Sequence, residues 1–570
     1  MTISIDKNID IPMQDGVVLR GDLYRPAVGG PFPTLIQRTP YNKELLALTG
    51  LTLDPIRAAA RGFAVLIQDV RARWASDGDV FFMYRDEFAD GGDTARWAAQ
   101  QSWCNGRIGG YGLSYMGGTS WLMAAAAPDD VSAIATATAP HDFWRNHLWR
   151  GGALNLGLLI SWSLAAIGPA ACIRNIKARG LATTLFDDLV DAIDAFDGWA
   201  RHTPIETLPP ARAEDAGFIP FLFEILKHPA PDAFTDSLLM TEHHGKVAAP
   251  ALMIAGWHDL LLEADLENWA AAQARAEETG AQHRLVIGPW SHGAFQNVVG
   301  EMDYGFRASG MLIDGREDLT NLQLRWFDRH LVGAGDGLDE DPPVKIFLQG
   351  ANVWRSETAW PPPGARTLTL NLTAAGALTE DKSAPGAQTY TFDPNHPTPT
   401  RGGPILLPAK YVRGPVDQSP LLRRADVLQF ATPPLGADLN IMGEISVVLF
   451  AATSGRDTDW VVKLCDVHPE GAVYNVTDGV LRARYRDGFD NPALLEPGTR
   501  HQYKIQLAPT AMRFKRGHRI MLLVTSSDFP RYDRNPNTGE SPTGATQFEP
   551  ARQTIFCGGE NASHISLSVV

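Results

Sequence analysis

Short apolar runs alternate with helical patterns over the first 140 residues of the chain. The runs typical of buried strands lie at 34–38, 63–69, 107–112 and 133–138. Between them, residues 86–101 and 115–127 repeat their apolar positions at the spacing of a helix. This alternation predicts a parallel sheet that helices cover on both faces.

The strand pattern stops near residue 144 and returns near residue 247. The intervening segment has helical periodicity, as in 185–202, and contains prolines but no convincing strand. The pattern then returns as a strand at 251–259, a helix at 264–280 and a strand at 283–293. Residues 144–246 are therefore predicted to be a helical insertion in the α/β domain, a natural position for a cap over an active site.

Helical patterns disappear after residues 359–365, AWPPPGA, whose consecutive prolines predict a stiff linker. The strand-like runs beyond it, separated by Gly, Pro, Asp and Asn turns, lie at 367–372, 445–452, 460–467, 503–509 and 519–526. They predict an antiparallel β-sandwich or jelly roll.

Composition narrows the range of partners and the compartment. The formal charge of −15 over 570 residues argues against nucleic acid or an anionic membrane, because either would require a basic face. The four cysteines form no CxxC pair, which favours buried free thiols in a reducing compartment. The N-terminal MTISIDKNID has no apolar core of a secretory signal, so we expect a cytoplasmic protein. The apolar stretch 151–172 contains polar residues and a proline, and a buried or substrate-lining helix is favoured over a membrane span.

The stretch 109–118, GGYGLSYMGG, places Ser114 between a predicted strand and a predicted helix. Its pattern is Gly112-x-Ser114-x-x-Gly117, with Met116 where the usual G-x-S-x-G elbow has its second glycine. A serine at this corner stands at the carboxyl edge of the sheet, beside free backbone N–H groups that can hold an oxyanion. The alternative is a glycine-rich turn with an incidental serine.

Two other stretches favour the catalytic interpretation. GWHDLL (256–261) places Asp259, and GPWSHG (288–293) places His292, just after predicted strands. Alone, these would be read as a turn-forming aspartate and a capping histidine. The chain order Ser, Asp, His is that of an α/β-hydrolase triad, in which the histidine removes the serine proton and the aspartate orients the imidazole. Ser114, Asp259 and His292 are therefore the predicted catalytic residues.

These motifs, together with QDVRARWASDG (68–78) and SSDFPRYDRNPNTG (526–539), make the chain similar to the cocaine esterase-like hydrolases, the CocE/NonD family. That family is related to the X-Pro dipeptidyl-peptidases and the α-amino acid ester hydrolases. The resemblance covers almost the whole chain, with Ala72 standing where the family more often has glycine. It implies four segments: an α/β-hydrolase domain in two parts, 1–143 and 247–355, a helical cap at 144–246 and a C-terminal jelly roll at 356–570.

The resemblance also implies further site residues. The oxyanion hole would use the backbone N–H of Tyr115 and the hydroxyl of Tyr41, from RTPYNK (38–43). Trp162 would wall the acyl site, although it could equally be a core residue. The stretch GGPILL (402–407) resembles the one through which the family's β domain reaches the pocket, so Leu407 would be a substrate-binding residue. The resemblance is also compatible with a homodimer.

Two more leucines, Leu260 and Leu261, directly follow Asp259 and should face the site. The tandem pair His243–His244 has no HExxH motif and no carboxylate at ligand spacing, so solvated or capping histidines are predicted and no metal site. No cofactor is expected.

The predicted function is a serine hydrolase of carboxylic esters that forms an acyl-enzyme, with a small-molecule ester carrying an aryl or bulky hydrophobic acyl group. An alternative is an amide-cleaving relative, an X-Pro dipeptidyl-peptidase or β-lactam acylase. A peptidase of that kind needs buried carboxylates for a substrate ammonium, and Asp187, Asp188 and Asp191 in the cap leave this open. An alternative of another class is a non-catalytic protein whose jelly roll binds a sugar or polymer.

Overall fold

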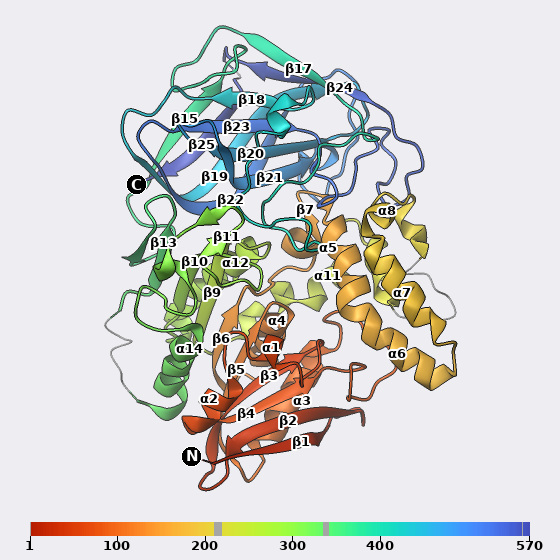
Figure 1. Ribbon diagram of the computed structural model, residues 1–570, viewed down its shortest axis with the longest axis vertical. Helices are drawn as coiled ribbons and strands as arrows, with labels where there is room; N and C mark the ends of the chain where they lie inside the picture. Colours follow the sequence, from red (N-terminus) through yellow and green to blue (C-terminus); the bar gives the residue numbers. More distant parts are fainter. Residues whose placement is uncertain (1, 210–218, 335–340, 561) are drawn as a thin grey trace.

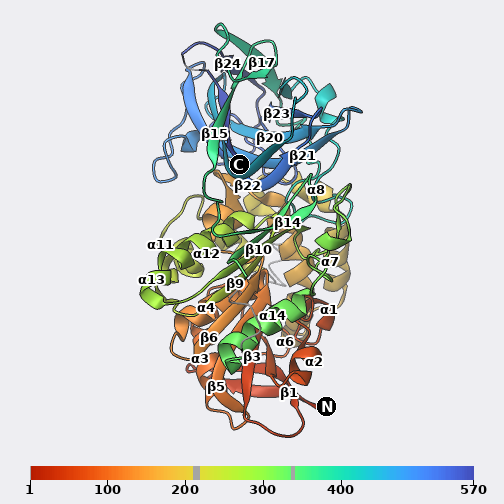
Figure 2. The same ribbon diagram turned by 90° about the vertical axis from the view of Figure 1, so that its left-hand side faces the viewer.

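A computed structural model describes residues 2–209, 219–334, 341–560 and 562–570. It has three parts, which Figure 1 shows in one view and Figure 2 after a quarter turn. The N-terminal part of the chain forms an α/β domain, and a group of helices that includes α6, α7 and α8 lies along one side. The C-terminal part of the chain forms a β domain.

The α/β domain is built on a ten-stranded sheet in the order β1-β2-β4-β3-β5-β6-β9-β10-β13-β14. Seven neighbouring strands, from β4 to β13, run parallel. The strands are β1 (Ile3–Pro12), β2 (Val18–Pro26), β3 (Phe32–Thr39), β4 (Ala64–Asp69), β5 (Cys104–Leu113), β6 (Val131–Ala137), β9 (Ala251–His258), β10 (Arg284–Ser291), β13 (Val344–Leu348) and β14 (Val353–Glu357).

The two edges of this sheet differ from the predicted parallel sheet. β1 and β2 form an antiparallel hairpin that joins β4, and β14 pairs antiparallel with β13 at the other edge. The strand runs of the sequence fall in the centre, where both faces are buried and the chain is continuously apolar. The edge strands β1 and β14 are partly exposed, so their apolar pattern is weak.

Helices cover both faces of the sheet, and the burial of β4 shows how. Ala64 and Leu66 belong to one core cluster, whereas Val65 and Ile67 belong to another, because neighbouring strand residues point to opposite faces. One face packs against α3 (Glu87–Ala99), α4 (Tyr115–Ala126) and α12 (Leu262–Ala274), and the other against α2 (Pro55–Ala60) and α14 (Leu319–Phe327). The domain also contains two short helices, α1 (Leu46–Thr49) and α13 (Ala276–Thr279).

The segment predicted as a helical insertion is mainly helical but contains a small hairpin near its start. β7 (Trp149–Arg150) pairs with β8 (Ala153–Leu154), which the sequence pattern did not predict. The helix expected at 185–202 is broken at Ala195 into two. The α-helices are α5 (Leu156–Ser161), α6 (Gly168–Arg179), α7 (Thr184–Asp194), α8 (Phe196–Ala200), α10 (Pro220–Leu226) and α11 (Ala233–Leu238), with π-helical turns η1 (Trp144–Leu148) and η2 (Trp162–Ile167) and 3₁₀ turns η3 (Ile205–Thr207), η4 (Met240–Glu242) and η5 (His244–Lys246).

The apolar stretch near residue 160 forms one long helical element, Leu156–Arg179, that starts later than predicted. Its length and mean hydropathy of 1.9 would also suit a membrane span, but 61% of its most apolar window is buried inside the protein. A core helix of a soluble protein has these properties too. The element packs in the largest core cluster, and its N-terminal part borders the cavity described below.

The β domain is a sandwich of two antiparallel sheets. One sheet has the order β16-β15-β25-β19-β24-β17, with β22 also paired to β19, and the other has the order β18-β23-β20-β21. The strands are β15 (Arg366–Leu372), β16 (Leu378–Thr379), β17 (Gly386–Phe392), β18 (Leu428–Ala431), β19 (Leu439–Thr453), β20 (Asp459–Val467), β21 (Val473–Arg482), β22 (His501–Phe514), β23 (Arg519–Thr525), β24 (Ala551–Cys557) and β25 (His564–Val569). All five runs read from the sequence are strands here.

The four cysteines are free and buried, as the sequence predicted. β14 extends the sheet of the α/β domain to Glu357, two residues past the boundary expected at 355.

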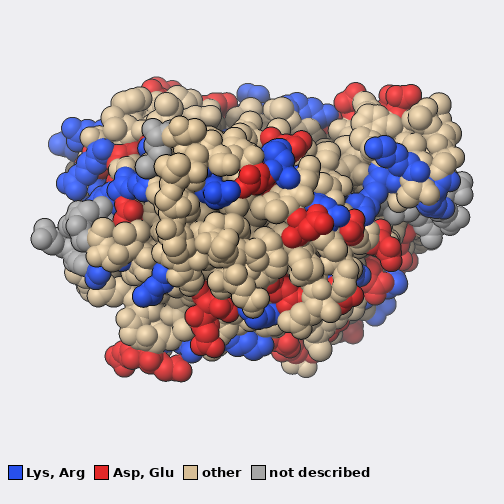
Figure 3. All heavy atoms as spheres, turned by 90° about the horizontal axis from the view of Figure 1, so that it is seen from below, with Lys and Arg blue, Asp and Glu red and all other residues tan. Residues whose placement is uncertain are grey.

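On the face seen from below, acidic and basic side chains are interspersed over the surface (Figure 3).

Candidate active site

Ser114 lies in a strained turn between β5 and α4. Its backbone has φ 59° and ψ −125°, which few non-glycine residues adopt outside functional turns. The turn is tight: a Cβ on Gly112 would lie 2.4 Å from the backbone of Met116. Gly112 is therefore required for the elbow, and Met116 belongs to a buried cluster of the α/β core.

The three predicted catalytic side chains form a continuous hydrogen-bonded chain. Nε2 of His292 lies 2.9 Å from Oγ of Ser114, and Nδ1 lies 3.0 Å from both carboxylate oxygens of Asp259. Because a carboxylate only accepts, Nδ1 carries a proton and Nε2 of the neutral ring can accept the serine proton. Each residue directly follows a parallel strand, so the three meet at the carboxyl edge of the sheet.

Other contacts fix the acid and the base. Asp259 is 1% exposed, and its Oδ1 accepts a 2.8 Å hydrogen bond from the amide of Leu261. The guanidinium of Arg413, from the β domain, donates at 2.7 Å to the carbonyl oxygen of His292. The β domain thus holds the loop that carries the base.

Tyr41 follows β3 and lies beside the nucleophile. Nε1 of Trp162 donates to the hydroxyl oxygen of Tyr41 at 2.9 Å, so the hydroxyl proton is free to be donated elsewhere. Burial raises the pKa of Tyr41 to about 12, opposed by its hydrogen bonds with Trp162 and Ser114 and by the charge of Arg73. Tyr41 therefore stays a neutral donor at physiological pH.

Arg73 connects the Tyr41 loop to the cap helix. Its side chain is buried and donates to the carbonyl oxygens of Pro40 at 2.9 Å and of Ile167 at 3.0 Å. The preceding residue, Ala72, has a left-handed φ of 58°, a conformation that glycine adopts at less cost. The loop therefore contains an alanine in a strained conformation. The next residue, Arg73, joins the Tyr41 loop to the cap helix through its two hydrogen bonds.

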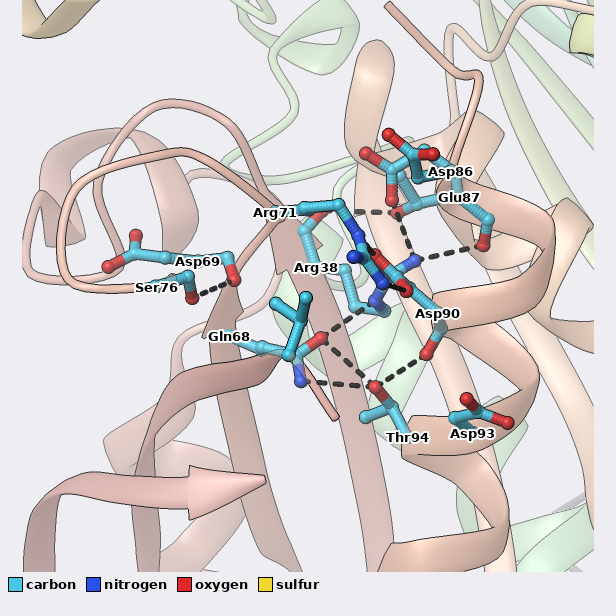
Figure 4. A network of polar contacts seen from close by, with 12 residues as sticks. Arg38, Gln68, Asp69, Arg71, Ser76, Asp86, Glu87, Asp90, Asp93 and Thr94 are labelled. Atoms are coloured by element: carbon cyan, nitrogen blue, oxygen red, sulfur yellow. Dashed lines mark hydrogen bonds and ion pairs between the residues drawn. The ribbon is translucent and has the colours of Figure 1, made fainter. Parts of the chain in front are cut away.

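The ring of Tyr115 borders the cavity of the nucleophile, and its hydroxyl joins a buried polar network around Glu87 and Arg38, which Figure 4 shows. Its hydroxyl donates to Oε1 of Glu87 at 2.8 Å, and Glu87 pairs with Arg38 at 2.7 Å. Burial raises the pKa of Glu87, opposed by Arg38 and the Tyr115 hydroxyl. Arg38 also donates to Oε1 of Gln68 on β4 at 2.7 Å. The network ties the first turn of α4 to β3, β4 and α3, and leaves the Tyr115 amide as one of the unpaired N–H groups at the start of a helix.

The nucleophile opens into a narrow cavity with mostly apolar walls. Leu260 and Leu261 line it as expected, and Trp162 forms part of its wall. The complete lining is Tyr41, Met83, Tyr84, Ser114, Tyr115, His147, Leu148, Leu158, Leu159, Trp162, Leu260, Leu261, His292 and Leu406.

The structure places Leu406, rather than Leu407, in the wall of the catalytic cavity. Leu407 packs against Gly157 and lines a neighbouring cavity, which Leu406 and Trp162 also border. An offset of one residue therefore decides whether a leucine of this segment reaches the cavity of the nucleophile.

Two polar residues of the cavity were not predicted from the sequence. His147 lies on η1, and burial together with the nearby His292 lowers its pKa to about 4, so it is neutral at pH 7. Tyr84 stacks on Tyr115 with ring centroids 4.1 Å apart. Within the described residues, neither Nδ1 of His147 nor the Tyr84 hydroxyl has a hydrogen-bond partner. Neither residue belongs to a short motif, and only the aromatic run FFMY (81–84) hinted at a pocket wall.

The tandem histidines of the cap lie apart from this site. His243 stacks on Phe88 at 4.2 Å, as a partly exposed side chain can. His244 is buried beside Trp121, contrary to the expectation of a solvated or capping residue, and burial lowers its pKa to about 3.

A nucleophile elbow, a Ser–His–Asp chain and a doubly covered parallel sheet define a serine hydrolase of the α/β-hydrolase fold. The sequence model of the X-Pro dipeptidyl-peptidase S15 family matches residues 15–294, and that of the X-Pro dipeptidyl-peptidase C-terminal non-catalytic domain matches residues 336–566. The chain belongs to the CocE/NonD family of serine hydrolases, as the sequence motifs predicted.

Similar proteins match over nearly the full length of the chain. The cocaine esterase of Rhodococcus sp. (strain MB1 Bresler) is 35% identical over 100% of this chain and 99% of its own. A protein of Mycobacterium bovis assigned as a serine esterase is 27% identical over 98% of this chain and 94% of its own. The crystal structure of an α-amino acid ester hydrolase is 25% identical, with a TM-score of 0.84 over 100% of this chain and 97% of that chain.

One substitution separates the role of the Tyr115 hydroxyl in stability from the role of the Tyr115 backbone N–H in the oxyanion hole. Tyr115→Phe removes the hydroxyl donated to Glu87 but keeps the amide N–H. We expect the free energy of unfolding to fall by about 1–3 kcal/mol, the cost of an unsatisfied buried polar group. The value of kcat should change less than about threefold, far below the effect of losing an oxyanion donor. Urea unfolding and ester kinetics measure the two effects, and a large loss of kcat at unchanged stability would contradict this assignment.

Proposed function

We propose that the protein is a serine esterase that hydrolyses small carboxylic esters with Ser114 as nucleophile, His292 as base and Asp259 as orienting acid. The observation that carries this proposal is the hydrogen-bonded chain from Oγ of Ser114 through His292 to the buried Asp259. The cocaine esterase relative has the activity that this arrangement suits.

The mechanism follows from the geometry. His292 takes the serine proton through Nε2 while Oγ attacks the ester carbonyl, and Asp259 stabilises the imidazolium that forms. The hydroxyl of Tyr41 and the amide of Tyr115 hold the oxyanion of the tetrahedral intermediate. His292 then protonates the leaving alcohol, and water activated by the same base releases the acid. No step needs a cofactor, because side chains supply every proton transfer.

The cavity walls support an aryl or bulky hydrophobic acyl group. Trp162 stacks on Tyr115 at 6.2 Å with their rings 16° apart, and leucines supply most of the other surface. A flat apolar group placed there gains burial without desolvating a charge. The unpaired Nδ1 of His147 and the Tyr84 hydroxyl offer hydrogen bonds to a polar substituent of the substrate.

The amide-cleaving alternative is less well supported. Asp187, Asp188 and Asp191 all lie exposed on α7. Among the described residues that line the catalytic cavity, none is an aspartate or glutamate. A substrate ammonium would therefore enter the cavity without a carboxylate partner, at a high desolvation cost.

A comparison of phenyl esters with Xaa-Pro anilides tests the proposal, with Ser114→Ala as the background control. We expect kcat/KM for phenyl benzoate and phenyl acetate to exceed that for the anilides. A preference for the anilides would support the peptidase alternative. Failure of a fluorophosphonate to label Ser114 would instead favour a non-catalytic binding protein.

The pKa of Tyr41 predicts the alkaline side of the pH profile. A tyrosine hydroxyl donates only while protonated, and burial raises its pKa to about 12. The donor form is therefore retained between pH 8 and 10, where an ordinary tyrosine begins to lose its proton. We expect no fall in kcat over this range at constant ionic strength. A decline centred near pH 10 that is absent from Tyr41→Phe would contradict the raised pKa.

A cytoplasmic location remains a proposal, supported by the four buried free thiols. The homodimer also remains a prediction.

A further inference from the structure

At one end of the smaller β-domain sheet, two histidines converge on a buried aspartate. Asp466 is on β20, His468 begins the turn from β20 to β21, and His518 directly precedes β23. One nitrogen of each histidine and a carboxylate oxygen of Asp466 all lie within 4.8 Å of one another. This cluster is in the β domain and shares no residue with the catalytic cavity.

The distances within the cluster are those of ligands around one small cation. Nε2 of His468 lies 3.3 Å from Oδ2 of Asp466. Nδ1 of His518 lies 2.9 Å from both carboxylate oxygens of Asp466, a hydrogen bond that a bound ion would replace. Two ligand atoms at about 2.0–2.1 Å from a tetrahedral zinc ion are about 3.3–3.4 Å apart. The first distance fits directly, and the second needs a movement of a few tenths of an ångström.

If the His468 ring is neutral, its Nε2 lone pair faces the carboxylate of Asp466, and a positive charge between them would remove the repulsion. Nδ1 of His468 lies 3.1 Å from Oε1 of Glu470, and because a carboxylate can only accept, Nδ1 carries the proton of the neutral ring. The lone pair of Nε2 then faces a carboxylate oxygen, which repels it. Either a second proton on the ring or a metal ion between the two atoms removes this repulsion.

The surroundings favour a metal ion. A carboxylate that accepts the outer N–H of a histidine ligand is the usual second partner at zinc sites, and Glu470 occupies that position. Asp466 is 3% exposed, so its carboxylate is held in place by the surrounding strands. The two histidine side chains are 19% and 12% exposed, so an ion can reach the cluster from solvent.

We propose that Asp466, His468 and His518 bind a divalent transition-metal ion of the zinc type, with Glu470 orienting His468. Two imidazoles and one carboxylate suit Zn²⁺, and the fourth position is left to water. The ion connects the β20–β21 turn to the start of β23, so it stabilises this end of the sheet.

Titration of the untagged, EDTA-treated full-length protein with zinc chloride tests the proposal. We expect one site that is lost, with affinity falling more than about a hundredfold, in His468→Ala and in His518→Ala, since even an outer partner is worth about 10–100-fold. Glu470→Gln should weaken the site within that outer-partner range. Esterase activity should be retained in all three variants and shows that they fold.

His396→Ala is the matched control. His396 also bonds an aspartate in the β domain, at 2.8 Å from Asp393, but it is exposed and belongs to no cluster of three metal-ligating side chains among the described residues. This variant should bind zinc like the wild type. Cobalt(II) in place of zinc should give the visible absorption of a tetrahedral complex in the wild type. Absence of a zinc site in the wild type, or zinc binding that persists in both histidine variants, would overturn the proposal and leave the cluster as a protonated histidine–aspartate network.

Discussion

Replacing Ser114 with alanine is expected to lower kcat for a phenyl ester by about a million-fold, as for a triad nucleophile in other serine hydrolases. The methyl group leaves nothing for His292 to activate, although the oxyanion donors and the cavity still bind substrate. The free energy of unfolding should change little, because the lost hydroxyl is at the cavity and contacts the base. Steady-state kinetics with active-site titration measure the first effect, and thermal unfolding measures the second.

Ser120→Ala is the matched control for this prediction. Ser120 lies on α4, the helix that follows Ser114, is buried, and donates to the carbonyl oxygen of Met116 at 2.9 Å. It should keep nearly full activity and full fluorophosphonate labelling. If Ser114→Ala retained more than about a hundredth of the wild-type kcat, far above the loss expected for a triad residue, another group would have to be the nucleophile.

The second large effect is expected for Tyr41→Phe, which should lower kcat by about 10²–10³-fold with a much smaller change in KM. The hydroxyl bonds the developing oxyanion more strongly than the ground-state carbonyl, and one such donor is worth about 3–4 kcal/mol. Fluorophosphonate labelling should become slower but still occur, because Ser114 and His292 remain in place.

The structure adds a stability effect to this variant. The indole N–H of Trp162 loses its acceptor, so the free energy of unfolding should fall by about 1 kcal/mol. Trp162→Phe separates the two roles, since it removes the same hydrogen bond but keeps the Tyr41 hydroxyl. Its kcat should fall far less than that of Tyr41→Phe. Equal losses in the two variants would mean that Tyr41 acts by packing the loop, and the second oxyanion donor would then have to be another group.

The central strands and the catalytic residues could both be predicted from the sequence, because both depend on the buried parallel strands. The strands from β3 to β10 are mostly buried on both faces, so each contains a short apolar run. Ser114, Asp259 and His292 each directly follow one of these strands, and parallel strands bring their carboxyl ends to one edge. Local patterns could therefore predict which side chains meet, although they lie up to 178 residues apart in the chain.

Elements whose burial depends on distant segments could not be predicted in this way. The hairpin of β7 and β8 has only two residues in each strand, and a Cβ on its turn residue Gly151 would lie 1.9 Å from the carbonyl oxygen of Val480 in the β domain. Its form thus depends on a domain some 300 residues further along the chain. β14 is partly exposed and lies at a sheet edge, so it lacks a strong apolar pattern.

The sequence by itself determined the fold class, the family and the order of the catalytic residues, because these depend on local periodicity and on short motifs. Only the tertiary structure decided that Leu406 rather than Leu407 lines the catalytic cavity, that His147 and Tyr84 also line it, and that Asp466, His468 and His518 converge. Each of these depends on the direction of a side chain and on the packing of segments from separate domains or strands. One chain's pattern of apolar and polar positions does not specify either.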